Sequence, residues 1–369
     1  MTSRSELAAW LRLLLTPGVG VESARKLLAA FGLPQAVFEQ SHAAWQAVVG
    51  TRAANALDTP PEPLEAQVDR LVAWLAEAQD HHVLTLGDPQ YPAELLQMAD
   101  PPLMLYVLGD VNALHHPRRL AVVGSRNPTP QGETNARQFA QALGEAGVCV
   151  VSGLALGVDG AVHDGALLGG SSTIAVVGTG LDRVYPKRHL SLAHRIAAQG
   201  AIVSEYPLGT PPLPENFPRR NRIIAGLSQG TLVVEAAVQS GSLITARLAA
   251  EQGREVFAIP GSIHAPQARG CHALIRQGAK LVESAQDILE DLRFTSSAAT
   301  EPGTPSVEAS CTTEDELLRA MGHDPVSLDA LQARTGMTTA HLQARLLELE
   351  LSGDVARLPG GLLQRQAQG

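Results

Sequence analysis

The chain contains few cysteines and no long apolar segment. Its three cysteines, Cys149, Cys271 and Cys311, lie far apart and form no CxxC pair among the 369 residues. This spacing argues against a disulfide framework and against a structural zinc site. No apolar run approaches the roughly 18 residues that cross a bilayer, and the N-terminus has no basic segment followed by an apolar one. We therefore expect a soluble cytoplasmic protein without a bound metal.

The chain also lacks an excess of basic residues. It has 28 lysines and arginines against 37 aspartates and glutamates, and its net charge is -9. This balance excludes a histone-like protein that binds nucleic acid with its whole surface. Contact with a polyanion would have to come from a local patch. The positions of the arginines are therefore more informative than their number.

Two common nucleotide-binding motifs are absent as well. A dinucleotide fingerprint requires G-x-G-x-x-G, but Gly178 and Gly180 are followed by Arg183 where the third glycine would stand. The sequence has no G-x-x-x-x-G-K-[ST] loop either. Acidic residues stand near predicted strand ends, but no histidine is placed to complete a catalytic set with Asp159 or Glu235. We expect neither a cofactor nor a catalytic residue.

The central part of the chain alternates short apolar runs with helical stretches. The runs are rich in valine and isoleucine, as is typical of strands buried on both faces of a sheet. Amphipathic stretches between them, such as Asn135 to Glu145 and Leu243 to Gln252, are long enough for crossover helices. The pattern predicts an α/β fold with a Rossmann-like, doubly wound, mostly parallel sheet. The predicted strands are Leu120–Val123, Val148–Val151, Thr173–Val177, Ala201–Val203, Thr231–Val234 and Val256–Ile259.

Helical patterns flank this α/β region on both sides. Leucines at helical spacing precede the Pro-Gly-Val-Gly turn at 17–20, and Val21 to Phe31 continues the period. Two helices about such a turn are typical of a SAM-like or helix-hairpin-helix domain, and equally of a plain turn between packed helices. Near the C-terminus, Leu328–Thr335, Ala340–Leu351 and Val355–Leu363 predict the two helices and β-wing of a winged helix. The predicted domains are 1–80 (N-terminal helical), 81–293 (Rossmann-like), 294–313 (flexible linker) and 314–369 (winged helix).

The loops at the carboxyl ends of the predicted strands are of most interest, because ligands of open parallel sheets bind there. Gly124-Ser125, Ser152-Gly153 and Ser240-Gly241-Ser242 combine glycine and serine beside predicted helix starts. Backbone amides in such turns can hold phosphates, although each glycine can equally serve only a tight turn. The same edge has more cations than acids. The cations are Arg126, Arg183, Lys187, Arg188, Arg219, Arg220 and Arg222, and the acids are Asp159, Asp182, Glu205, Glu215 and Glu235.

One stretch of this edge is especially rich in arginine. Arg219, Arg220 and Arg222 occupy three of four consecutive positions, directly ahead of the apolar run Ile223 to Leu227. Guanidinium groups are planar, permanently charged forks that suit phosphate oxygens and base faces. We expect these arginines to end the long loop after the fourth predicted strand and to form one wall of a groove. The apolar run would then anchor them on the sheet.

Together these motifs resemble a known family. Gly124-Ser125-Arg126, Tyr185-Pro186, the run Asn-Phe-Pro-x-Arg-Asn-Arg-Ile-Ile at 216–224 and Ser240-Gly241-Ser242 are similar to motifs of the DprA (Smf) family of DNA-processing proteins. The resemblance covers roughly residues 103–292. It implies a single-stranded DNA-binding recombination mediator without enzymatic activity, which protects DNA taken up in natural transformation and loads the recombinase RecA onto it. It also implies a homodimer that forms through residues 263–275.

The resemblance also assigns roles to residues of the edge loops. Gly124, Ser125 and Arg126 would form a phosphate pocket, and Lys187 would contact the DNA backbone. The family usually has asparagine two residues after this lysine, where the chain has His189, so the hydrogen bonding of this loop departs from the family pattern. With the glycine-serine loops added, the expected DNA-binding residues are Gly124, Ser125, Arg126, Ser152, Gly153, Lys187, Phe217, Arg220, Asn221, Arg222, Ser240 and Gly241.

Two alternative functions remain open. The domain is also related to LOG-type phosphoribohydrolases and other nucleotide-binding enzymes, whose P-G-G-x-G-T-x-x-E signature is only partly matched by residues 227–235. These lack the Pro-Gly-Gly and carry Glu235 one residue late. The winged helix could instead read DNA sequence. Its second helix, however, carries Arg345 beside Glu348 and Glu350, a mixed face more typical of a solvated surface or a protein contact, so an accessory role is preferred.

Overall fold

The computed structural model describes residues 3–294, 316–322, 325–358 and 361–366. The centre of the described chain is a nine-stranded sheet with the strand order β1-β2-β6-β5-β4-β3-β7-β8-β9. The strands from β6 to β9 in this order run parallel, whereas β1 and β2 are antiparallel at one edge. The strands are β1 His81–Thr85, β2 Met104–Gly109, β3 Arg119–Val123, β4 Cys149–Ser152, β5 Thr173–Val176, β6 Ala201–Ser204, β7 Gly230–Val233, β8 Glu255–Ala258 and β9 Lys280–Leu281.

The apolar runs of the sequence form the parallel part of the sheet. The six predicted strands correspond to β3 to β8, with each end within one residue of its predicted position. Every residue of β3, β4, β5, β6 and β7 is buried, as expected for strands covered on both faces. The predicted α/β class with a mostly parallel sheet is confirmed.

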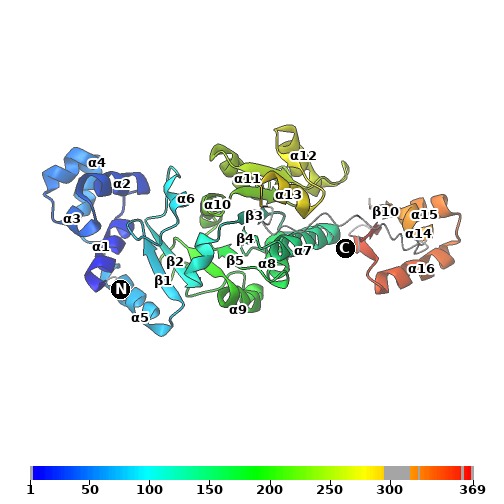
Figure 1. The fold of residues 1–369 in the computed structure, drawn as a ribbon, viewed down its shortest axis with the longest axis horizontal. Coiled ribbons are helices and arrows are strands. Elements are labelled where there is room, and N and C mark those ends of the chain that lie inside the picture. Colours follow the sequence, from blue (N-terminus) through cyan, green and yellow to red (C-terminus); the bar gives the residue numbers. More distant parts are fainter. Residues whose placement is uncertain (1–2, 295–315, 323–324, 359–360, 367–369) are drawn as a thin grey trace, which may run out of the picture.

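Helices cover both faces of the sheet (Figure 1). Along β3, Leu120 and Val122 pack in one core with α7 and α8, and Ala121 and Val123 pack in another core with α10 and α11. The alternation follows from the two-residue period of a strand. The helices of the α/β domain are α6 Ala93–Leu96, α7 Pro130–Glu145, α8 Val158–Leu168, α9 Leu190–Gln199, α10 Asn216–Gly226, α11 Ser242–Glu251, α12 Arg269–Arg276 and α13 Ala285–Asp291, with short 3-10 helices η1 Val111–His115, η2 Lys187–His189 and η3 Pro266–Ala268.

The direction of winding changes at β3. From β3 the chain adds β4, β5 and β6 on one side, and it then returns to place β7 and β8 on the other. The carboxyl ends of β3 and β7 are therefore neighbours whose following loops diverge to opposite faces. Such a switch point opens a crevice at the sheet edge, where doubly wound proteins bind their ligands.

Helices at the N-terminus share a core with one edge of the sheet. Trp10, Leu71 and Trp74 belong to the same buried cluster as Tyr106 of β2 and Ile202 of β6. Side chains of Ser3 and Ser41 accept hydrogen bonds from backbone amides and cap the first and fourth helices. These helices are α1 Arg4–Leu15, α2 Val21–Phe31, α3 Pro34–Phe38, α4 His42–Leu57 and α5 Leu64–Glu77.

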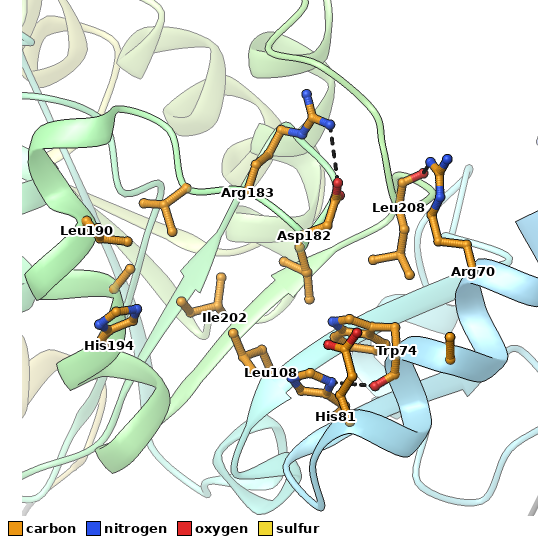
Figure 2. Close-up of a pocket in the computed structure, with 15 residues that line it drawn as sticks. Arg70, Trp74, His81, Leu108, Asp182, Arg183, Leu190, His194, Ile202 and Leu208 are labelled. Carbon is orange, nitrogen blue, oxygen red and sulfur yellow. Dashed lines mark hydrogen bonds and ion pairs between the residues drawn. The ribbon is translucent and has the colours of Figure 1, made fainter.

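A cavity of about 580 Å³ lies where α5 meets the sheet (Figure 2). The rings of Trp74 and His81 are stacked with their centroids 4.2 Å apart, and His81 Nδ1 donates to the Trp74 carbonyl at 2.6 Å. On the other side, Arg70 and Gln67 of α5 both donate to the carbonyl of Leu208, at 3.1 and 3.2 Å. Helix α5 thus fixes the chain that leaves β6.

The C-terminal region has the elements of a winged helix. Its three-stranded antiparallel sheet has the order β10-β12-β11, and Gly336 ends α15 in a left-handed conformation with φ 68°. The predicted linker lies outside the described residues except for Phe294. The elements are α14 Glu316–Met321, β10 Val326–Ser327, α15 Leu328–Thr335, α16 Thr339–Leu351, β11 Val355–Leu358 and β12 Leu362–Arg365.

Among the described residues, no helix combines the length and apolar character needed to span a bilayer. The same residues contain no group of three or more histidines, cysteines, aspartates or glutamates that could hold a metal ion. Cys149 and Cys271 are buried free thiols, and Cys311 lies outside the described chain.

Candidate nucleic-acid interface

The loops at the switch point surround a cavity of about 440 Å³, which we call the switch-point groove. Its walls come from the loop after β3, the loop after β4, the first half of α10 and the loop before α11. Eight of the twelve predicted DNA-binding residues line it, whereas Ser152, Gly153, Lys187 and Arg222 do not. The eight are Gly124, Ser125, Arg126, Phe217, Arg220, Asn221, Ser240 and Gly241.

Gly124, Ser125 and Arg126 form the wall after β3. A Cβ atom on Gly124 would lie 2.6 Å from Val158 Cγ2, so only glycine allows this loop to approach the start of α8. The backbone carbonyl of Ser125 accepts from Val158 N at 3.1 Å, and its hydroxyl accepts from Asn127 N. These contacts hold the loop while the Arg126 side chain remains exposed.

Two aromatic rings border the groove beside Arg126. The guanidinium carbon of Arg126 lies 5.7 Å from the ring centroid of Phe217, and the rings of Phe217 and Tyr185 are 5.6 Å apart. Tyr185 is 47% exposed, and Lys187, two residues later, is exposed on η2. The arrangement offers an aromatic face beside an exposed cation, which suits a nucleobase and its adjoining phosphate.

The opposite wall is the loop that precedes α11. Nothing lies within 4 Å of the position that a Cβ atom on Gly241 would take, so this residue opens on the groove. The Ser240 and Ser242 hydroxyls are 2.6 Å apart, and Asn221 Nδ2 donates to the Gly241 carbonyl at 3.3 Å. Gly241 caps α11 without a side-chain hydrogen bond, and the amides of Ser242, Leu243 and Ile244 in the first turn donate to Ser240 and Gly241.

The arginine stretch is helical, which corrects the prediction that it ends a loop. Asn216 to Gly226 form α10, so successive side chains rotate by about 100° around its axis. Arg219 therefore points to solvent, whereas Arg220 and Arg222 are 4% and 9% exposed. The three guanidinium groups do not form one charged surface.

Arg220 connects the chain segments at the base of the groove. Its Nη1 donates to the Gly153 carbonyl at 2.5 Å and also to the Val176 carbonyl, and its Nε donates to Asn221 Oδ1 at 3.1 Å. Burial lowers the pKa of Arg220 to about 10, and the charge of Asp159 opposes this effect. The guanidinium therefore stays charged at neutral pH, and Arg220 itself lines the groove.

Arg222 faces away from the groove and is paired with acids. Its two terminal nitrogens donate to the two carboxylate oxygens of Glu205, each at 2.6 Å, and its Nε donates to Asp100 Oδ2 at 2.7 Å. Burial alone would lower the pKa of Arg222, but its hydrogen bonds and ion pairs with Glu205 and Asp100 raise it overall. Arg222 therefore links α10 to β6 and to the segment before β2.

The loop after β4 mainly supports the groove and contributes little to its surface. Ser152 is fully buried and donates to the Val122 carbonyl at 2.7 Å. A Cβ atom on Gly153 would lie 2.7 Å from Asp159 Oδ2 and would also meet the Arg220 guanidinium. Leu154 adopts a positive φ of 57°, and its carbonyl accepts from His189 Nδ1 at 3.1 Å. The positive φ lies in a region that costs energy for leucine.

Two acidic residues of the edge, Glu235 and Asp159, are hydrogen-bonded to neighbouring groups. The Glu235 carboxylate accepts from the Thr129 amide at 2.9 Å and from its hydroxyl at 2.6 Å, at the start of α7. Burial raises the pKa of Glu235, and the bonds from Thr129 oppose this. Asp159 is buried and accepts from the Ala155 amide at 3.2 Å. Burial raises the pKa of Asp159, and the charge of Arg220 opposes the rise.

Several contacts of this region have no signal in the sequence. The partners of Arg222 lie 17 and 122 positions away in the chain, and only the tertiary fold brings them together. Pro218 and Gln239 also line the groove without having been predicted. His163, on α8, is fully buried, with Nδ1 2.8 Å from Thr173 Oγ1, and burial lowers its pKa to about 3, so it is a core residue.

Comparison with known proteins identifies the family. A family model described as DNA recombination-mediator protein A matches residues 82–293. The chain belongs to the DprA family. A model of the DprA winged helix domain matches residues 301–361, so both the α/β region and the C-terminal region of this DprA-family chain are accounted for, and the resemblance found in the sequence is confirmed.

Relatives of this DprA-family chain include proteins of known structure. The protein Smf of Escherichia coli (strain K12) is 45% identical over 303 residues, which are 80% of each chain. The crystal structure of DprA from Streptococcus pneumoniae is 37% identical, has a TM-score of 0.68 and covers 78% of this chain and 98% of its own. A Helicobacter pylori DprA structure, described as giving insight into a single-stranded DNA binding mode, is 31% identical, has a TM-score of 0.53 and covers 57% of this chain and 96% of its own.

Replacing Arg222 with alanine should strongly destabilise the fold. Glu205, whose side chain is 15% exposed, would lose a bidentate partner, and breaking a largely buried ion pair costs about 3–5 kcal/mol. Urea unfolding would measure the change. Arg219→Ala, three residues earlier on the exposed side of α10, should change stability by less than about 0.5 kcal/mol. Equal midpoints for the two variants would contradict the role assigned to Arg222.

Proposed function

We propose that this protein is a single-stranded DNA-binding recombination mediator without enzymatic activity. The observation that carries the proposal is the convergence of Gly124-Ser125-Arg126, Phe217 and Ser240-Gly241 on one groove at the switch point of the sheet. The groove combines backbone turns suited to phosphates with an exposed cation and an aromatic face. Membership in the DprA family and the described DNA binding mode of the Helicobacter pylori relative support it.

The character of the groove favours recognition of the DNA backbone. Arg126 is an exposed cation of the groove, and Lys187 is exposed on η2 outside its lining; neither makes an ion pair among the described residues. A groove that offers cations, amides and a stacking ring binds strands of any sequence. The negative charge of the whole chain, -9, would at the same time discourage nonspecific binding outside the groove.

Loading of RecA during natural transformation is the cellular role that we propose. A mediator has to hold single strands of any sequence, and a groove that combines a cation with a stacking ring suits this requirement. The family description as a recombination mediator supports the role. We place the protein in the cytoplasm, where buried free thiols such as Cys149 and Cys271 are stable.

Homodimerisation is proposed for residues 263–275. Ile263 is 74% exposed, and a cavity of about 660 Å³ lies between α11 and α12. Val238, which also lines this cavity, is 62% exposed. Large exposed apolar side chains beside a cavity favour a protein contact, and a second copy would place two DNA grooves on one particle.

The enzymatic alternative has little support from the groove. Hydrolysis of a nucleotide would require a carboxylate free to handle a proton or to contact the ribose. Both oxygens of Glu235 accept hydrogen bonds from Thr129, and Asp159 is buried beside Arg220. A carboxylate that caps a helix contributes to the fold, so we propose that neither acid is catalytic.

An accessory role is proposed for the winged helix. Leu347 and Leu351 on its helix α16 are 55% and 82% exposed, and Arg357 is paired with Glu350 at 3.1 Å. A helix that reads base edges in the major groove of DNA needs free polar side chains instead. This face therefore suits a protein contact better than sequence-specific reading.

Arg126→Ala and Lys187→Ala should each weaken binding to oligothymidylate and to mixed-sequence strands alike. Each removes one phosphate contact, so the slope of log K against log salt should fall in magnitude by about 0.7. Fluorescence anisotropy at several salt concentrations measures both quantities. Arg52→Ala, which removes an exposed arginine of α4, is the matched control. Unchanged affinity and slope in both variants would refute the groove assignment.

The same variants test the mediator role. On single-stranded DNA with limiting RecA, the wild-type protein should accelerate RecA filament formation, and Arg126→Ala and Lys187→Ala should slow it in proportion to their loss of DNA affinity. Strand-dependent ATP hydrolysis by RecA reports the filament. If wild-type protein binds DNA but leaves RecA assembly unchanged, the mediator role is refuted while DNA binding stands.

Ile263→Glu should convert the dimer to a monomer without loss of folding. The side chain is exposed in the single chain, so a glutamate there is solvated before association and would be buried uncompensated after it. Light scattering after size exclusion measures the mass. Leu168→Glu, at an exposed position on α8, should remain dimeric. A wild-type protein that is monomeric at all concentrations would contradict the proposal.

Wild-type protein should release no free base from adenosine monophosphate, because no free carboxylate stands in the groove. Chromatography of the reaction mixture would detect adenine. Glu235→Gln, which retains one acceptor oxygen for Thr129, should also leave DNA affinity unchanged. Release of base by the wild type that Glu235→Gln abolishes would establish the enzymatic alternative.

A further inference from the structure

A second cavity, of about 680 Å³, lies beside the switch-point groove. It is enclosed by the loop after β3, the first turns of α7 and α8, and the segment from η2 into α9. Four arginines line it together with His189, so we call it the arginine cavity. The four are Arg126, Arg137, Arg188 and Arg195.

The charge of the arginine cavity is not balanced within the described residues. Arg195 is paired with Asp164 at 2.5 Å, and Arg137 lies 3.9 Å from Glu133. These two acids are the ones that line the cavity, so the charges of Arg126 and Arg188 have no carboxylate partner there. Two uncompensated guanidinium groups at one hollow favour an anion.

The cavity and the groove share Arg126, which lines both. The loop between β4 and α8 also contributes to both linings. Its residue Ala155 lines the groove, and the next residue, Leu156, lines the arginine cavity. At the other end, Lys187 is followed directly by Arg188. A strand that passes from the groove along Arg126 into the cavity would therefore next meet the charge of Arg188.

The lining of the arginine cavity differs from that of the groove in one respect. The groove has Phe217, whereas the arginine cavity contains no phenylalanine, tyrosine or tryptophan. In place of such a ring the cavity offers guanidinium groups, which are charged forks suited to phosphate oxygens. Its chemistry therefore suits the backbone of a strand.

We propose that the arginine cavity is a second backbone subsite, in which single-stranded DNA continues from the groove and its phosphates contact Arg188. The proposal rests on the proposed function, because it concerns the path of the same strand. The groove would hold a base and its phosphates, and the arginine cavity would hold only the backbone that follows. Nucleotides beyond the groove would thereby add affinity through charge alone.

Length dependence of binding tests this subsite. Oligothymidylates of about 4, 8 and 16 nucleotides cover the usual site sizes of single-strand binding folds. Arg188→Ala should leave affinity for the shortest strand unchanged and lower it about threefold to tenfold for the longest. The salt slope should fall by about 0.7 for the longest strand only. Arg126→Ala should weaken binding at every length, and Arg52→Ala at none.

The outcomes separate the subsite from the proposed function. A loss for Arg188→Ala that is equal at all lengths would assign Arg188 to the groove, and no loss at any length would remove the cavity from the path. Inorganic phosphate or thymidine monophosphate that binds at millimolar concentration and abolishes the Arg188 effect would make the cavity a small-anion site. Each of these results overturns the subsite. Failure of the wild type to bind any of the strands would overturn the proposed function itself.

Discussion

The groove depends on one buried guanidinium group. Arg220 reaches from α10 under the sheet edge and donates to the carbonyls of Gly153 and Val176, at the ends of β4 and β5. A charged group in such a place is costly unless its hydrogen bonds are made. Asp159 at the start of α8 contributes the opposing charge. The loops that carry the exposed residues of the groove are thus held in place by buried charged residues.

Most of the fold could be predicted because its signal is local. Continuous apolar runs predict strands buried on both faces, and the runs that became β3 to β8 are of this kind. Helix α10 was missed because its first half is polar, with Pro218 and three arginines, and resembles a loop. Only its packing against α11 and the sheet makes it helical. The antiparallel direction of β2 beside β6 is determined by tertiary packing, and no local sequence pattern indicates it.

The candidate site was predictable where backbone geometry determines the residue. Gly124 has no room for a Cβ atom, and a glycine at a predicted strand end marks this position. Side-chain direction was not predictable. In the sequence, Arg220 and Arg222 cannot be distinguished from the exposed Arg126. They are buried because of their positions around the axis of α10. Arg137 and Arg195, on the outer faces of helices, carry no pattern that would connect them to a groove.

The shared core of the N-terminal helices and the sheet restricts how the family can vary in length. Tyr106 and Ile202 of the antiparallel edge are covered by Trp74 and Leu71, and α5 also holds the Leu208 carbonyl. Deleting these helices from this chain would expose an apolar sheet face and release the segment that leads into α10. A relative that possesses only the sheet domain must therefore make this face polar, or cover it with another protein surface.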